Sequence, residues 1–446
     1  MRDLAFVAFL VALVGMGFRR PFLLVLGYVY VDIVSPQRLT YLLLNTVPVS
    51  LIMVVLAAMG WALFDDKKDT RVAPRQFLML VLLIYCGVTS LQADFPVDAL
   101  RKWDWVWKAL AFGIFLPLTL RTRLRIEALA LFMILSAVSI IIVGGIKTLV
   151  SGGGYGALNL MVTNNSGLYE GSIISCVAIA IIPLIIWLVK SGTIYPSDWR
   201  VKTFAYALIF ACLLVPVGTQ ARTGLVCIAV LAVLMLRSTK RRVLYVTCVA
   251  AASLVIIPLL PASFTSRMDT IKDYKADTSA GTRLAVWSWT WDYVKEHPFG
   301  GGFDAYRGNK IKVVTTGGSD SDTSTSVEYD QARAYHSAYF EMLGEQGWPG
   351  LILWLIIHLG GLIRMEILRA RYRNRDGSEW IGSLANALQQ GHFIYLIGSL
   401  FVGIAFQPFV YMLVGLQIGL DTYARRKARD ADQQPFGGNR SAAIPV

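Results

Sequence analysis

Charged residues are scarce in this chain. Asp, Glu, Lys and Arg make up 16% of its 446 residues, whereas soluble domains contain about 25%. Hydrophobic residues account for 55% of the sequence, and the mean hydropathy is +0.55. A water-soluble protein this apolar could not cover its surface with polar groups. The composition therefore excludes a soluble globular domain and predicts many membrane spans.

Cysteine and histidine are also rare. All five cysteines fall within apolar segments, which argues against a disulfide framework and against a cysteine-based metal site. The sequence has no Gly-x-Ser-x-Gly elbow and no His-Glu-x-x-His helix, so the commonest hydrolase mechanisms lack their motifs. No small-residue cleavage site follows the first apolar run. Arg19-Arg20 stands there instead, so we interpret this run as a retained segment.

Apolar runs of near-spanning length recur along the chain. We predict an all-α polytopic bundle of about twelve transmembrane helices. The number is approximate because the first two runs are short for a hydrocarbon core of about 30 Å. Gln407-Pro408 interrupts the last apolar stretch, so a hairpin or a broken helix is expected there. The candidate spans cover residues 4–18, 21–34, 47–64, 77–93, 105–120, 126–148, 170–189, 203–217, 222–237, 243–260, 347–364, 391–406 and 408–421.

The basic residues gather in five short loops. The positive-inside rule predicts that these loops face the cytoplasm, which accounts for the net charge of +13 without a nucleic-acid partner. Segments 149–169, 218–221 and 261–346 should then face the opposite side. Counting spans back from the last segment places the N-terminus outside. The basic loops are 67–71, 121–125, 237–242, 369–375 and 425–427.

These features divide the chain into four regions. Residues 1–260 are predicted to form an N-terminal transmembrane bundle, 261–346 a periplasmic catalytic loop, 347–421 the C-terminal transmembrane helices, and 422–446 a disordered cytoplasmic tail. Within the loop, residues 313–330 are rich in Gly, Ser and Thr and are expected to be flexible. Residues 283–295 are expected to form an amphipathic helix at the membrane interface. Its apolar face would carry Leu284, Trp287, Trp291 and Val294.

Three polar residues stand where the external loops meet the membrane. His336 follows the flexible stretch and precedes a span, a position in which a histidine can act as a base near neutral pH. Arg222 opens a span on the external side, where positive residues are less expected. Arg283 begins the amphipathic helix. Either arginine could grip a phosphate with two hydrogen bonds, and the alternatives are a snorkelling anchor for Arg222 and a surface salt bridge for Arg283.

Other polar signals favour structural roles. His358 and His392 lie in apolar runs and are expected to face other helices, and His297 precedes a proline in a turn. Asp320-Ser-Asp322 spells an acidic pair that many sugar transferases use to hold a metal. It lies in a low-complexity run with no other ligand type nearby, so we predict no metal site and no cofactor. Gly300-Gly-Gly302 lacks the context of a phosphate loop and is expected to form a turn.

Three ordered motifs together resemble the O-antigen ligase family. They are Thr219-Gln-Ala-Arg222-Thr-Gly, then Arg283-Leu with Trp287 and His297-Pro-Phe-Gly-Gly-Gly-Phe, and then the fifteen-residue run that begins at His336-Ser-Ala-Tyr-Phe-Glu. The family often has Asn after the histidine, where this chain has Ser337. Residues 35–41 (Ser-Pro-Gln-Arg-Leu-Thr-Tyr) also resemble a subgroup associated with exosortase systems. This family shares a superfamily with O-antigen polymerases and bacterial protein O-oligosaccharyltransferases.

The resemblance implies a glycosyltransferase of the GT-C-like membrane type in the bacterial inner membrane, with its active site facing the periplasm. Such a ligase moves a polysaccharide from undecaprenyl pyrophosphate to a sugar hydroxyl of lipid A–core, with inversion and without a metal. By this resemblance Arg222, Arg283 and Gln220 would bind the pyrophosphate, and His336 would act as the base. The family usually has twelve spans with both termini in the cytoplasm, which conflicts with the N-terminal placement expected from the charge pattern.

Two alternatives remain open at the level of sequence. A polymerase or a protein O-oligosaccharyltransferase would use the same motifs with a different acceptor. A transporter of lipid-linked sugars would use the arginines as substrate contacts and His336 as a gate. Transporters tend to bind near the membrane midplane and to carry internal repeats. Here the polar groups gather at the outer surface and no repeat is visible, which favours an enzyme.

Overall fold

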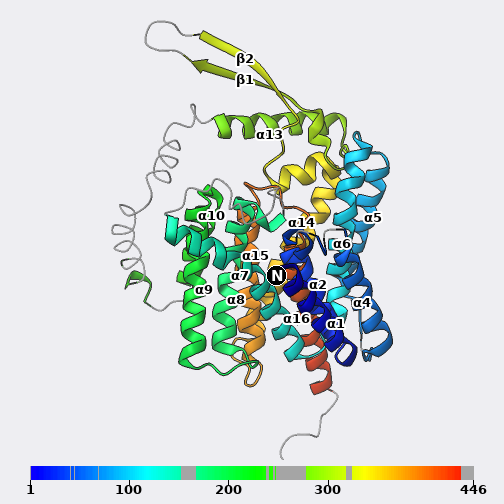
Figure 1. Cartoon of the computed structure of the whole chain (residues 1–446), viewed down its shortest axis with the longest axis vertical. Helices are drawn as coiled ribbons and strands as arrows, with labels where there is room; N and C mark the ends of the chain where they lie inside the picture. Colours follow the sequence, from blue (N-terminus) through cyan, green and yellow to red (C-terminus); the bar gives the residue numbers. More distant parts are fainter. Residues whose placement is uncertain are drawn as a thin grey trace, which may run out of the picture.

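The protein is a bundle of long helices capped at one end by a helix that lies across it and by a projecting hairpin (Figure 1). A computed structural model describes residues 2–40, 42–44, 46–68, 70–151, 167–237, 241–244, 247, 278–317 and 324–432. The helices of the bundle are α1 (Arg2–Arg19), α2 (Phe22–Val34), α3 (Pro36–Leu39), α4 (Val49–Phe64), α5 (Pro74–Leu91), α6 (Pro96–Thr119), α7 (Arg123–Ser151), α8 (Gly171–Ser191), α9 (Trp199–Gly218), α10 (Arg222–Arg237), α14 (Ala338–Tyr372), α15 (Glu379–Gly398) and α16 (Pro408–Asp432).

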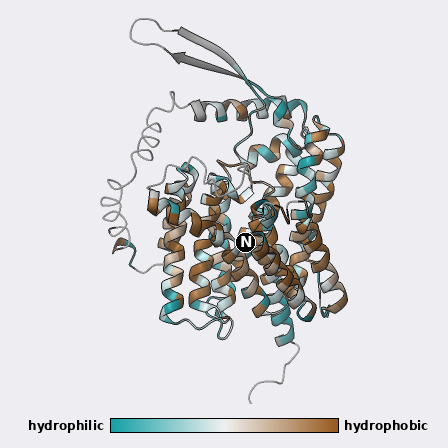
Figure 2. Cartoon of the chain, viewed as in Figure 1, coloured by the Kyte–Doolittle hydropathy of each residue, from teal (hydrophilic) through white to brown (hydrophobic). Residues whose placement is uncertain are grey.

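The composition of these helices suits a lipid environment. Within the described ranges, α5, α7, α8, α9 and α14 are long and apolar enough to cross a membrane, and α2 and α4 are shorter apolar helices. Hydrophobic residues run along the bundle, while hydrophilic residues concentrate at helix ends and around the cap (Figure 2). Large apolar side chains such as Phe77, Phe204 and Ile363 are exposed on the outside. These features indicate a membrane protein, as the composition predicted.

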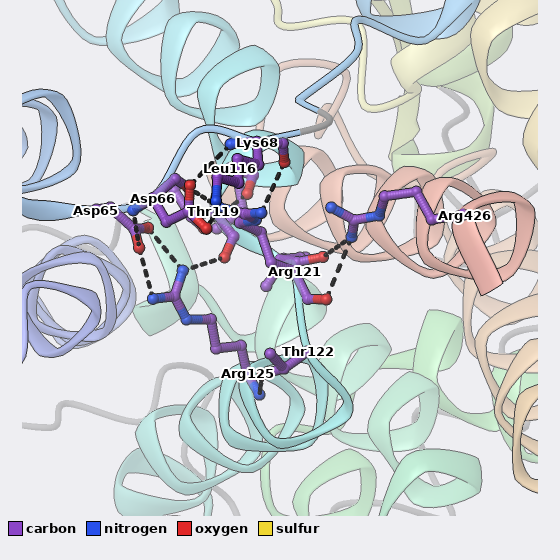
Figure 3. Close-up of polar contacts among 10 residues, drawn as sticks. Asp65, Asp66, Lys68, Leu116, Thr119, Arg121, Thr122, Arg125 and Arg426 are labelled. Atoms are coloured by element: carbon purple, nitrogen blue, oxygen red, sulfur yellow. Dashed lines mark hydrogen bonds and ion pairs between the residues drawn. The ribbon is translucent and has the colours of Figure 1, made fainter. Parts of the chain in front are cut away.

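The predicted basic loops lie together at the end of the bundle away from the cap. Arg121 pairs with Asp66 across 3.3 Å, and Arg426 donates to the carbonyl of Leu120 at 3.0 Å (Figure 3). Arg237 pairs with Glu366 across 2.8 Å on another side of this end. We call this end the basic end. The positive-inside pattern requires this clustering at one end of the bundle.

The predicted spans correspond to helices, but several boundaries differ. The candidate at 222–237 coincides with α10, and the candidate at 243–260 lies largely outside the described residues. The helix expected at 391–406 is instead α15, which ends at Gly398. Residues 399–407 form a connection, and α16 starts at Pro408 as the proline predicted. α16 also continues to Asp432, beyond the boundary at 421, because its last turns pack through Tyr372 and Ser378 onto neighbouring helices.

The capping region corrects two expectations. The stretch at 313–330 was expected to be flexible, yet β1 (Lys310–Gly317) and β2 (Ser324–Gln331) pair antiparallel, with Lys310 opposite Gln331. The Val and Thr residues of this stretch favour extended backbone and outweigh its Gly and Ser content. α13 (Thr278–Glu296) confirms the predicted helix. Its buried face carries Val286 and Val294, whereas Leu284 and Trp291, expected on the same face as Val294, are exposed.

A chain of buried polar groups crosses the bundle. Arg75 donates to the Oε1 atom of Gln417 at 3.0 Å, so the Nε2 group of Gln417 donates to the Nδ1 atom of His392 at 3.0 Å. His392 must then donate from Nε2 to the Nδ1 atom of His358 at 2.8 Å. Both histidines are fully buried and face other helices, as expected. The direction of this chain makes both rings neutral, which suits a structural role in an apolar bundle.

Candidate functional site

Two of the family-like motifs are physically interlocked. The glycine turn after Pro298 lies against the middle of the fifteen-residue run that begins at His336. The amide of Gly301 donates to the carbonyl of Gly344 at 3.1 Å, and the amide of Trp348 donates to the carbonyl of Pro298 at 3.0 Å. This close approach requires glycine, because a Cβ atom at Gly300 would lie 2.5 Å from the nitrogen of Gly347. The glycines therefore form a structural turn, as predicted.

The backbone on both sides of His336 is fixed by groups distant in sequence. Buried Asn309 forms two hydrogen bonds with the backbone of Arg333, at 2.7 and 3.0 Å. The indole of Trp287 on α13 donates to the carbonyl of Tyr335 at 2.9 Å. Just after the histidine, the amide of Ala338 donates to the carbonyl of Ser399 at 2.8 Å. The histidine is thus held by α13 on one side and by the end of α15 on the other.

Two candidate site residues have left-handed backbone conformations. His336 has φ = 48° and Gln220 has φ = 52°. Such a conformation costs a non-glycine residue about 1–3 kcal/mol, and it persists only where surrounding contacts enforce it. These residues tend to cluster at functional sites. The sequence does not reveal this left-handed backbone, because neither position carries glycine, the residue that usually marks it.

Charged groups converge around His336. The side chain of His336 reaches the surface, and the protein covers part of it. This partial burial and the neighbouring guanidinium groups of Arg283 and Arg333 lower the pKa of His336 below its usual range. Arg283 also lies near Glu170, which precedes α8. Burial raises the pKa of this carboxyl group, although hydrogen bonds from Ser172 and the charge of Arg283 act in the opposite direction. Arg283 and His336 are therefore brought together, and Glu170 is a neighbour that sequence reasoning missed.

Arg222 and Gln220 occupy the tight turn between α9 and α10. Arg222 is the first residue of α10 and is half-buried. The hydroxyl of Thr219 in this turn lies 2.8 Å from that of Ser175 on α8. Thr219 also packs against Gly171, since a Cβ atom at Gly171 would lie 3.2 Å from its side chain. The turn therefore packs against the start of α8, next to Glu170. An arginine at the N-terminus of a sixteen-residue helix adds its charge to the positive end of the helix dipole.

A buried ion cluster connects the interlocked motifs to α6. The ammonium group of Lys102 lies 2.6 Å from Glu341 and 2.8 Å from Glu345, and 4.0 Å from Asp304 in the loop after the glycine turn. The side chain of Glu345 is fully buried. Its Oε1 atom also accepts from the amide of Asp304 at 3.0 Å, and the amide of Ala405 donates to Glu341 at 3.1 Å. Sequence reasoning missed this cluster, because Lys102 is more than two hundred residues from its partners.

Arg38 is a further cationic residue, and it lies near the residues that precede α8. It lines a cavity of about 30 Å³ with Ser35, Tyr169 and Gln407. Its charge opposes the rise in the pKa of Tyr169 that burial causes, which shows that the two side chains are close. Ser35 and Arg38 belong to the sequence motif at 35–41. This motif therefore lies next to the residues that precede α8.

The part of the chain that the structure describes contains no group of three or more His, Cys, Asp or Glu side chains arranged to hold a metal ion. Asp320 and Asp322 lie outside the described residues. Of the five cysteines, the four described ones are buried free thiols, and Cys248 lies outside the described residues.

The fold and the polar cap define the class. They describe a helical membrane protein in which His336, exposed at the capped end, lies close to Arg283 and Arg333. Residues 207–355 match the family described as O-Antigen ligase, which supports the resemblance that the three motifs indicate. The matched segment contains all four predicted site residues. Residues 1–193 match a family of unknown function, DUF5935. No curated protein matches the chain.

The match of residues 207–355 to this family supports a general enzymatic role. Members of this family are glycosyltransferase-like ligases or polymerases, and the family implies lipid-linked glycans and membrane lipids as partners.

Proposed function

We propose that the protein is an inner-membrane glycan ligase that transfers a polysaccharide from undecaprenyl pyrophosphate to a sugar hydroxyl of lipid A–core on the periplasmic side. The observation that carries this proposal is the position of His336 beside Arg283, at the junction of two interlocked motifs. The base and the anion-binding group come from different elements, so an acceptor hydroxyl and a donor pyrophosphate could meet between them.

The proposed chemistry divides the roles by charge. The neutral imidazole of His336 removes the proton from the attacking hydroxyl, and its lowered pKa keeps it neutral at pH 7. The hydroxyl oxygen forms a bond to the anomeric carbon while the bond to the pyrophosphate oxygen breaks, which inverts that carbon. Arg283 and Arg222, with Gln220 beside them, stabilise the charge that develops on the leaving pyrophosphate. The two guanidinium groups then neutralise the pyrophosphate charge in place of a divalent metal ion.

The proposal requires that the cap faces the periplasm and the basic end faces the cytoplasm. The clustering of the five basic loops supports this orientation. Single cysteines introduced as Asp320→Cys and Asn374→Cys should differ in whole cells, with only the first labelled by an impermeant thiol reagent. Equal labelling of the two positions would overturn the orientation and the reaction that depends on it.

The reaction itself is tested with the purified protein, undecaprenyl-pyrophosphate glycan and candidate acceptors. One transfer to lipid A–core identifies a ligase, a ladder on the lipid carrier identifies a polymerase, and transfer to a protein hydroxyl identifies an oligosaccharyltransferase. The absence of any covalent product would favour transport. His336→Ala should abolish transfer while donor binding stays nearly intact. His297→Ala is the matched control, since this histidine is also exposed at the cap but stacks on Tyr293 and lies 3.3 Å, through Nδ1, from the carbonyl oxygen of that residue.

A further inference from the structure

A large cavity opens at the basic end, far from the candidate active site. It has a volume of about 1080 Å³ and lies between the start of α7, the ends of α10 and α14, and the start of α15. Sites for small organic ligands usually measure about 300–1,000 Å³. The cavity is therefore large enough for an organic headgroup rather than a single ion.

Five arginines line this cavity, against one carboxylate, that of Glu379. Three of the arginines already have acidic partners. Arg123 pairs with Glu127 at 2.7 Å, while Arg237 and Arg369 share Glu366. The other two, Arg242 and Arg373, have no ion-pair partner among the residues that the structure describes. The cavity therefore has an excess of positive charge, with at least two guanidinium groups available to an anion.

The uncharged lining suits a phosphodiester with a polar headgroup. Asn386 and Gln390 contribute side-chain amide groups from successive turns of α15. The hydroxyl of Ser383 also lines the cavity, but it already donates to the carbonyl of Trp380 and accepts from the indole of Trp187. Trp380 forms part of the wall, and the guanidinium of Arg123 lies 4.6 Å from the centre of its ring. Tryptophan is typical of the layer in which membrane headgroups lie. Guanidinium groups match the geometry of phosphate oxygens with two parallel hydrogen bonds.

The second basic cavity at this end differs in kind. It is lined by Arg71, Arg425, Arg426 and Arg429 but measures only about 180 Å³. Arg426 donates to backbone carbonyl oxygens of the loop after α6 (Figure 3), so part of its charge holds the fold together. This smaller cavity provides a control of the same charge at the same end of the molecule.

We propose that the larger cavity is a binding site for the headgroup of an anionic phospholipid. The cavity lies at the level where apolar helices end, which is where headgroups lie. Basic pockets between transmembrane helices on the cytoplasmic side bind anionic lipid headgroups in other membrane proteins. The site does not depend on the transfer reaction, and it is separate from the donor site at the cap.

The test is native mass spectrometry of the full-length protein titrated with phosphatidylglycerol, with phosphatidylcholine as the neutral lipid. Phosphatidylglycerol should bind at least about tenfold more tightly than phosphatidylcholine. Arg242→Gln with Arg373→Gln should weaken phosphatidylglycerol binding by about tenfold. Arg71→Gln with Arg429→Gln removes the same charge from the smaller cavity and should change binding by less than about twofold.

Three results would overturn the proposal. Equal losses in the two double variants would mean that general electrostatic attraction drives binding. Displacement of the lipid by inorganic phosphate at an equal concentration would identify a soluble anion as the ligand. Equal affinity for phosphatidylglycerol and phosphatidylcholine would show that the negative charge of the headgroup does not contribute to binding. If the arginine variants do not fold, Asn386→Leu tests the same cavity without a change in charge, and an unchanged phosphatidylglycerol affinity would count against the site.

Discussion

Replacement of Lys102 with methionine should destabilise the protein strongly, although Lys102 touches none of the proposed substrate-binding residues. The substitution keeps the length of the side chain but removes the charge that Glu341 and Glu345 share at 2.6 and 2.8 Å. Both carboxylates are buried, with 8% and 0% of their side chains exposed. Removal of one partner from a buried ion pair costs about 3–5 kcal/mol, because an uncompensated charge remains.

The matched control is the neighbouring residue on the same helix. Arg101 pairs with Asp98 at 3.1 Å, but 74% of its side chain is exposed. Exposed pairs of this kind contribute about 0.2–1 kcal/mol. Arg101→Met therefore removes the same formal charge at a small cost. Unfolding by sodium dodecyl sulfate in mixed micelles, followed by tryptophan fluorescence, compares the free energy of unfolding of the two variants with that of the wild type.

The pH dependence separates an electrostatic cause from simple loss of packing. In Lys102→Met, the carboxylates of Glu341 and Glu345 stay buried without a counter-charge. Burial of an uncompensated carboxylate disfavours its charged form relative to an unfolded chain. A carboxyl group with a raised folded-state pKa destabilises the fold while it is charged, and the penalty falls as pH falls toward that pKa. The difference in stability between variant and wild type should therefore narrow from pH 8 to pH 5.5.

Two outcomes would refute this reasoning. A cost for Lys102→Met no larger than that for Arg101→Met would show that the cluster is not buried as described. A cost that stays constant with pH would show that packing, not charge, is lost. The double variant Lys102→Met with Glu345→Gln removes one of the uncompensated charges and should recover part of the stability, since residues in one network are not additive.

The other predictions concern the reaction. Arg222→Lys and Arg283→Lys should lose most of the transfer activity although the charge is kept, because lysine cannot offer two aligned donors; wild-type rates in a glycan-transfer assay would contradict this. The acid loss of activity should lie at a pH below 6.5, because His336 accepts a proton only when neutral and its pKa is lowered from that ordinary value. The acid limb of kcat should lie at higher pH than that of kcat/KM, because bound pyrophosphate offsets the charge of Arg283; coincident limbs would argue against their proximity. Transfer should survive EDTA and the pair Asp320→Ala and Asp322→Ala, and loss restored by a divalent ion would contradict a metal-independent mechanism.

The sequence predicted the helices well because apolar length is a local property. Each described candidate span corresponds to a helix, and the break at Pro408 lies where proline requires it. Boundaries were less accurate where polar residues are buried by tertiary contacts. α6 begins at Pro96, nine residues before the predicted span at 105, because Lys102 within that stretch is neutralised by carboxylates from another part of the chain.

The sequence placed His336 and Arg283 at one site but gave no indication of how they are held there. His336 and Arg283 were expected at one site, and the structure brings them together. Their arrangement depends on Asn309 and Trp287, whose bonds to the backbone around the histidine join segments that the hairpin separates in sequence. No periodicity or motif rule gives such pairs, because a side chain that binds a distant carbonyl has no fixed sequence spacing. Glu170 was missed for the same reason.

The contacts that hold the start of α14 explain why the motif extends so far beyond His336. The glycine turn and the run from Gly344 to Trp348 are joined by backbone hydrogen bonds, and Lys102 ties this unit to α6. The unit fixes the start of α14, and hence the left-handed backbone of His336 just before it. Arg222 lies outside this unit, at the separate turn between α9 and α10. In the proposed site, Arg222 therefore contributes to donor binding from a different element than the one that holds His336. The proposed reaction thus separates donor binding at this turn from activation of the acceptor at the start of α14.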